Sequence, residues 1–170
     1  MGVKYSRMAF SEESERLRRQ VLSPWSFWLF QWKTLPLAAA AGLRVRTLDE
    51  ARCTVFLPGG WRTQNPFRST YFAAQAMAAE MSTGAPAMVL VGGASASVAM
   101  LVREVRGVFA RKIVGPSVFA FDDVASLRAA IDRAAATGLS ETFVARSIGT
   151  AADGTVAAEF EITWSFKRRG

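Results

Sequence analysis

The 170-residue chain contains no histidine and a single cysteine, Cys53. Without histidine, the usual zinc sites and the Ser-His and Cys-His nucleophile pairs cannot be built. One cysteine also excludes an internal disulfide. Cys53 is a poor candidate nucleophile, because nothing evident in the sequence lowers the pKa of its thiol. We therefore expect no metal site and no cysteine-based active site.

Signals of several other protein classes are missing as well. The first residues, MGVKYSRMAFSEESE, hold no apolar segment of the kind found in secretory signal peptides, so we expect a cytoplasmic protein. No repeat, low-complexity tract or Gly/Ser linker interrupts the chain. Because 51% of the residues are apolar, residues 1–170 can fill the core of one domain.

The formal net charge of +7 favours anionic partners without specifying their chemistry. Nucleic acid, acidic lipid and a phosphate-bearing ligand are the candidates. The basic residues are scattered along the chain, and no zinc-finger or RNA-binding signature accompanies them. We therefore expect no binding of nucleic acid.

The N-terminal part of the sequence predicts helices. Ser11, followed by Glu12 and Glu13, is typical of a helix start. The stretch VLSPWSFWLFQW at residues 21–32 holds three of the five tryptophans, and it is shorter than the roughly 20 apolar residues that cross a bilayer. The favoured interpretation is a helix packed on the body of the domain. An interfacial membrane helix and a protein interface are the alternatives.

Alternating apolar and polar residues predict most of the strands. Residues 43–49 and 52–58 form a predicted hairpin, and residues 143–149 and 155–169 form another around the turn AADG. Residues 87–91, 97–113 and 118–121 are further predicted strands. Between them, Asp122 or Asp123 caps a predicted second helix that ends at Gly138.

The stretch NPFRSTYFAAQAMAAEMSTG, residues 65–84, predicts one long helix. Asn65 is a good cap, Pro66 suits the first helical position, and Gly84 and Pro86 are expected to end the helix. A helix that is apolar nearly all round should be buried all round. We therefore predict an α+β fold in which an antiparallel sheet of five or six strands wraps around this helix.

Glu80 is the only acid in that helix. On a helical wheel it shares a face with small or apolar residues, namely Ser69, Ala73, Ala76 and Met77. Burial would raise the pKa of its carboxyl, and a nearby arginine would lower it. One interpretation is structural, with Glu80 near a helix end and paired to Arg62 or Arg68. In the other, Glu80 is a general base beside a substrate carbonyl.

The segment WRTQNPF at residues 61–67, followed by the helix YFAAQAMAAEMSTG, resembles the hot-dog fold, acyl-CoA thioesterase-like superfamily. The similarity runs from about Leu35 to Arg168 and is greatest to a branch related to the phenylacetate-type thioesterases. It implies a hot-dog core at residues 35–170, preceded by a helical segment at residues 1–34. In those enzymes an Asn is followed by Gly, His-Gly-Gly and an acid. Aligning Asn65 with that Asn places Tyr71, Phe72 and Ala73 at His-Gly-Gly and Glu80 at the acid.

The resemblance implies roles for these residues. Glu80 would be the catalytic base or nucleophile, and Asn65 would orient substrate or water. The N–H of Phe72 or Ala73 would bind the oxyanion, although both glycines are replaced. The residues expected to contact the substrate are Ser69, Tyr71, Phe72, Ala73 and Ala76.

Two functions follow from the resemblance. The first is hydrolysis of acyl-CoA or acyl-carrier thioesters, with CoA entering only as part of the substrate and no separate cofactor. The second is a non-catalytic acyl- or lipid-binding protein, which could be peripheral to a membrane. A homodimer, or a dimer of dimers, is implied in either case, because the family builds its sites between subunits.

Overall fold

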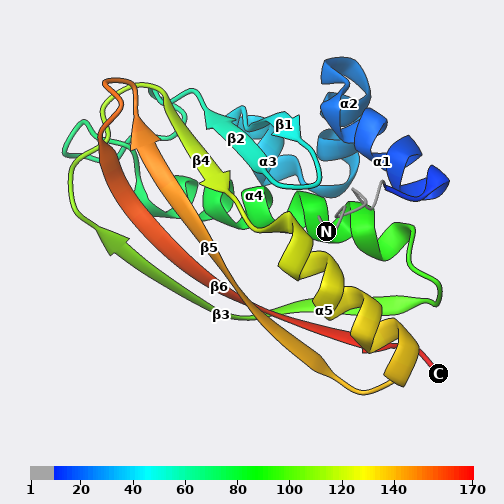
Figure 1. The fold of residues 1–170 in the computed structure, drawn as a ribbon. Helices are drawn as coiled ribbons and strands as arrows, with labels where there is room; N and C mark the ends of the chain where they lie inside the picture. Colours follow the sequence, from blue (N-terminus) through cyan, green and yellow to red (C-terminus); the bar gives the residue numbers. More distant parts are fainter. Residues whose placement is uncertain (1–9) are drawn as a thin grey trace, which may run out of the picture.

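The computed structural model describes residues 10–170 (Figure 1). Residues 1–9, which supply most of the segment used to argue against a secretory signal, lie outside the described residues. Five helices are present in the described part: α1 Glu12–Leu22, α2 Pro24–Thr34, α3 Pro36–Ala41, α4 Phe72–Gly92 and α5 Val124–Thr137. The strands are β1 Arg44–Leu48, β2 Cys53–Leu57, β3 Val98–Phe109, β4 Ser117–Phe121, β5 Glu141–Ala151 and β6 Val156–Arg168.

The six strands form one antiparallel sheet in the order β1-β2-β4-β5-β6-β3. The predicted hairpins are confirmed, since β1 pairs with β2 and β5 pairs with β6. In the last strand, alternating residues from Ala158 to Phe166 (Ala158, Phe160, Ile162, Trp164 and Phe166) are all buried, which confirms the period-two pattern there, whereas Val156, predicted on the same face, is exposed. Strand β3 lies at one edge of this sheet, next to β6.

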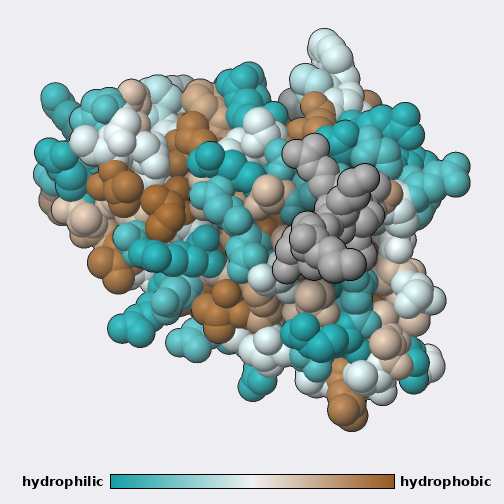
Figure 2. Space-filling view, in the orientation of Figure 1, coloured by the Kyte–Doolittle hydropathy of each residue, from teal (hydrophilic) through white to brown (hydrophobic). Residues whose placement is uncertain are grey.

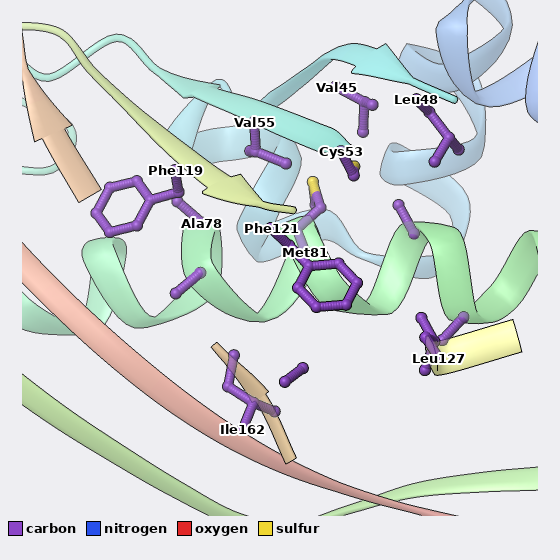
Figure 3. Packing of buried hydrophobic residues seen from close by; sticks show 14 of the residues in the cluster. Val45, Leu48, Cys53, Val55, Ala78, Met81, Phe119, Phe121, Leu127 and Ile162 are labelled. Carbon is purple, nitrogen blue, oxygen red and sulfur yellow. The ribbon is translucent and has the colours of Figure 1, made fainter. Parts of the chain in front are cut away.

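The long helix α4 lies against the buried face of the sheet, as the α+β prediction required (Figure 1). Side chains from the strands, such as Val55, Phe119 and Ile162, gather around Ala78 and Met81 of α4 (Figure 3). The second predicted helix is α5, which Asp123 caps by accepting a hydrogen bond from the Ser126 N–H. It contacts β5, β6 and α4, so it shares the buried face of the sheet with α4.

The predicted start of the long helix was wrong. Helix α4 begins at Phe72, and Asn65 instead organises a turn before it. Its Oδ1 accepts hydrogen bonds from the Phe67 N–H at 3.0 Å and from the Ser69 N–H at 3.2 Å. This local bonding of the Asn side chain competes with the helix, so residues 65–70 stay outside it.

The predicted end of the long helix was also wrong. Helix α4 continues through Gly84 and Pro86 to Gly92, and residues 87–91 are therefore helical and not a strand. Gly84 and Pro86 are both buried in the domain. The packing of α4 on its neighbours outweighs the local preference of these two residues to end a helix.

The N-terminal helices attach to the body on one side only. The Ser14 Oγ donates a hydrogen bond to the Val89 carbonyl at 3.0 Å, which ties α1 to α4. Gln31 of α2 is buried and donates to the Leu43 carbonyl at 3.2 Å. Phe27 is buried beside it, while the tryptophans of α2 are exposed. The expected packing of this helix therefore holds for one face, and its aromatic face is open.

Apolar surface is unevenly distributed over the molecule. On the face shown in Figure 2, hydrophobic residues lie in separate groups among hydrophilic ones. Within residues 10–170, no helix is both long and apolar enough to cross a membrane.

Candidate active site

Glu80 lies in the middle of α4, on a side of the helix that is only partly buried. Ala73, Ala76, Met77 and Glu80 are each partly exposed, while Ala74, Ala78 and Ala79 are buried. The partly exposed residues recur at helical spacing and form one stripe. The small side chains of Ala73 and Ala76 leave room along this stripe.

The Glu80 carboxylate lies against a glycine and a tryptophan. A Cβ added at Gly84 would lie 2.8 Å from Glu80 Oε1 and 3.3 Å from the Trp164 ring. The Trp164 Nε1–H donates to Thr83 Oγ1 at 2.9 Å, and the Thr83 hydroxyl donates to the Glu80 carbonyl at 3.0 Å. Gly84 therefore makes the space for the carboxylate, and Thr83 holds the ring that borders it.

The Glu80 carboxylate has no cation paired to it among residues 10–170. Among the described residues, none forms an ion pair or a hydrogen bond with the Glu80 side chain, so the pairing with Arg62 or Arg68 that the structural interpretation assumed is not present there. Burial raises the pKa of the Glu80 carboxyl above its ordinary value. A carboxylate with a raised pKa is a stronger base, which suits it to take a proton from water near neutral pH.

A groove of about 570 Å³ opens beside the first turns of α4. Its lining is mostly apolar and comes from α2, α3, the loop before α4 and α4 itself; it includes Trp32, Leu37, Trp61, Tyr71, Ala73 and Met77. Met77 precedes Glu80 by three residues, and residues at this spacing are neighbours on a helix. The groove therefore ends about one helical turn from the carboxylate.

A second pocket, of about 530 Å³, lies on the other side of the α4 N-terminus. Asn65, Ser69 and Phe72 line it together with two cations, Arg111 and Lys112. No side chain caps α4, so N–H groups in its first turn are available to a ligand. The positive end of the helix and the two cations favour an anionic or strongly polarised group here.

The predicted site residues fall into three places. Asn65, Ser69 and Phe72 line the second pocket, Ala73 lines the groove, and Tyr71 borders both. Glu80 and Ala76 lie farther along α4 and line neither cavity. The two predicted catalytic residues, Asn65 and Glu80, thus do not share a pocket within one copy of the chain.

Two features of the site were missed by the sequence reasoning. Trp164 was covered only by the predicted last strand, residues 155–169, and Gly84 was predicted to end the helix. The spacing of Gly84 four residues after Glu80 was the available signal, because it places a residue without a side chain beside the carboxylate. Nothing in the sequence indicated that Trp164 would be its other neighbour.

Other reactive groups are absent from the site. Cys53 is fully buried, and this burial raises the pKa of its thiol far above the usual range. In the part of the chain that the structure describes, no group of three or more His, Cys, Asp or Glu residues could hold a metal ion. Glu80, whose carboxyl pKa is raised by burial, is therefore the candidate proton acceptor of this site.

Comparison with known proteins gives structural matches only. No protein-family model and no curated protein matches the sequence. Among solved structures, a protein of unknown function from Chlorobaculum tepidum is 12% identical and has a TM-score of 0.73, with 95% of this chain and 98% of that chain covered. A mutant thioesterase from Pseudomonas aeruginosa is 17% identical, with a TM-score of 0.67 over 90% of this chain and 99% of that one. A thioesterase from Haemophilus influenzae is 11% identical, with a TM-score of 0.60 over 82% and 88%. At these identities the likeness shows a shared fold.

Proposed function

From the hot-dog fold that this chain shares with solved thioesterases, we propose that it is a thioesterase-like hydrolase. Its substrate would be an acyl thioester of coenzyme A or of an acyl-carrier protein. Coenzyme A would enter as part of the substrate, and no separate cofactor is required.

The observation that carries this proposal is the environment of Glu80. Its carboxylate is half-buried and lies one turn from an apolar groove, and none of the described residues forms an ion pair with it. A buried carboxylate without a partner lowers the stability of the fold. Its presence is therefore best explained by a function. An acyl chain in the groove would bring its thioester carbonyl toward the carboxylate.

In the proposed reaction, the Glu80 carboxylate takes a proton from a water molecule as that water attacks the thioester carbonyl carbon. The carbonyl oxygen becomes an oxyanion in the tetrahedral intermediate, which N–H donors would stabilise. When the intermediate collapses, the C–S bond breaks and the thiolate leaves. The proton held by Glu80 passes to this thiolate, which restores the carboxylate.

The oxyanion donors would come from a second copy of the chain. Glu80 follows Phe72 by eight residues, which is about 12 Å along a helix axis. The Phe72 and Ala73 N–H groups therefore cannot contact the same carbonyl as Glu80 of their own helix. We propose a homodimer in which Glu80 of one copy works with the α4 N-terminus and Asn65 of its partner.

The test is hydrolysis of a panel of acyl-CoA thioesters that differ in chain length, with released thiol as the readout. We expect Glu80→Gln to lower kcat/KM by about 10² to 10⁴, the usual contribution of a general base. The matched control is Glu12→Gln, which removes one exposed carboxylate from α1 and should leave kcat/KM unchanged. Equal activity in Glu80→Gln and in the wild type would refute the role of Glu80.

A second function is favoured by one specific observation. The resemblance described above aligns Tyr71, Phe72 and Ala73 with the His-Gly-Gly of the phenylacetate-type thioesterases, so the motif is absent in that alignment, and the groove beside Tyr71 and Ala73 is apolar. A non-catalytic acyl- or lipid-binding protein would keep the groove without the chemistry. Native mass spectrometry that finds a bound acyl compound in a protein without hydrolytic activity on the panel would support this alternative over the hydrolase.

A further inference from the structure

The exposed face of α2 is a continuous aromatic surface. Trp25, Trp28, Leu29 and Trp32 lie on one side of the helix at helical spacing, and they are 79%, 48%, 61% and 48% exposed. The Trp28 ring contacts Trp25 and Trp32 edge to face, with ring centroids 6.4 and 6.3 Å apart. The rings therefore pack on one another in a row, while Phe27 anchors the opposite side of α2 in the core.

This surface continues beyond α2. Leu37 of α3 is 71% exposed and Trp61 in the loop before α4 is 79% exposed. Both line the same groove as Trp32, so three separate segments meet around its opening. We call this set the tryptophan surface: Trp25, Trp28, Leu29, Trp32, Leu37 and Trp61.

The segments that carry the tryptophan surface hold basic residues and no acidic ones. Residues 16–48 and 51–79 contain no aspartate or glutamate, although they make up most of the first half of the chain. Lys33, Arg62 and Arg68 lie in the segments that carry the surface, and all three are exposed. The Arg62 guanidinium lies 5.8 Å from the centroid of the Trp61 ring. Within the described residues, none of these three cations forms an ion pair.

We propose that the tryptophan surface docks this protein onto an anionic lipid bilayer. Tryptophan rings suit the headgroup region, because one end of the ring is apolar and the other donates a hydrogen bond. Unpaired lysine and arginine side chains beside the rings would contact the lipid phosphates. Helix α2 has 11 residues, about 16 Å, so it would lie along the surface of the bilayer.

Docking in this way would place the mouth of the groove against the bilayer. Trp32 and Trp61 belong to the tryptophan surface and also line the groove. An acyl chain could then move between the bilayer and the groove without crossing water. This docking is independent of the proposed function, because it uses neither Glu80 nor hydrolysis.

The test is flotation of the purified protein with two kinds of vesicle, one of phosphatidylcholine alone and one of equimolar phosphatidylcholine and phosphatidylglycerol. We expect binding to the anionic vesicles and little binding to the neutral ones, with binding that weakens as salt is raised. The double variant Trp25→Ser/Trp28→Ser should have an affinity for anionic vesicles that is lower by about tenfold or more. Lys33→Gln/Arg62→Gln should lose affinity for the anionic vesicles only.

The matched control is Val114→Ser/Leu139→Ser, which removes two side chains that are each 69% exposed and lie outside the tryptophan surface. It should bind as the wild type does. Absence of wild-type binding to anionic vesicles, or equal loss in the control and the tryptophan variant, would overturn the proposal. So would a change in the oligomeric state of the tryptophan variant by light scattering without a change in vesicle binding, since the surface would then be a protein interface.

Discussion

Glu80 is a carboxyl group held among apolar neighbours, and this placement affects the stability of the fold as well as any reaction. Its pKa is raised in the folded protein by burial. At low pH the carboxyl is neutral in both the folded and the unfolded state, so its ionisation does not lower the free energy of unfolding. As the pH rises, the unfolded chain ionises first, and stability is lost until the pH passes the folded-state pKa.

We therefore predict that Glu80→Gln stabilises the protein in a pH-dependent way. The free energy of unfolding should rise by roughly 1 kcal/mol at about pH 8, and the gain should vanish at about pH 3. Urea titrations of both proteins across this range measure the effect. Glu12→Gln is the control and should show no such trend. A destabilised Glu80→Gln protein at the higher pH would mean that the carboxylate has a favourable partner in the folded state.

At this scale the sequence was informative about Glu80 and uninformative about its surroundings. A lone acid in an apolar helix stands out in the sequence by composition alone. Trp164 lies more than 80 positions away, and only the path of β6 across α4 brings it to the site. The sequence also could not show that Glu80 lacks an ion-pair partner among the described residues. Arg62 and Arg68 are near Glu80 in the sequence, but neither pairs with it in the fold.

Among the elements, the strands were predictable and the ends of α4 were not. One face of each long strand is buried, so alternation in the sequence is forced by the fold. The ends of α4 depend on competing local and tertiary effects. At the start, the hydrogen bonds of the Asn65 turn keep the preceding residues out of the helix. Near the end, the packing of α4 in the domain keeps Gly84 and Pro86 helical.

A substitution at Gly84 separates the structural role of α4 from its role in holding Glu80. Alanine favours a helix, but its side chain would fill the space beside the Glu80 carboxylate. Alanine is preferred over glycine in helices by about 1 kcal/mol, whereas the new Cβ would lie 2.8 Å from Glu80 Oε1. The carboxylate can move away because it ends a flexible side chain. We predict that Gly84→Ala keeps the melting temperature of the wild type within a few degrees and lowers kcat/KM by about tenfold or more.

The double variant Glu80→Gln/Gly84→Ala supplies the control for this prediction. If Gly84 acts through the carboxylate, the second substitution should cause no further loss of activity once Glu80 is replaced. Additive losses would indicate that Gly84→Ala damages the site in another way, for example by moving Trp164. Wild-type activity in the single variant would show that the position of the carboxylate is not critical.

For the whole molecule, the β3 edge of the sheet is an open surface on which a second copy could pair. This strand has 12 residues, and among the described strands it pairs with β6 alone, so its other side is an edge of the sheet. Val105 and Phe109 face the same side of the sheet as buried Ile162 and Ala158, yet each is 47% exposed. An edge that is long and apolar is prone to pair with another strand. Pairing of two β3 strands would also bring the open stripes of two α4 helices to the same face of a continuous sheet.

We predict that the wild type is a dimer at micromolar concentration and that Val105→Lys weakens the dimer about tenfold or more, because the added charge would be buried where the copies meet. Light scattering across a dilution series measures the dimer. The control is Val156→Lys, which changes a valine of equal exposure, 47%, away from this edge. If catalysis needs both copies, the kcat/KM of Val105→Lys should fall on dilution and recover at high protein concentration. A loss that does not depend on concentration would place Val105 in the substrate path, and a fully active wild-type monomer would contradict the two-copy site.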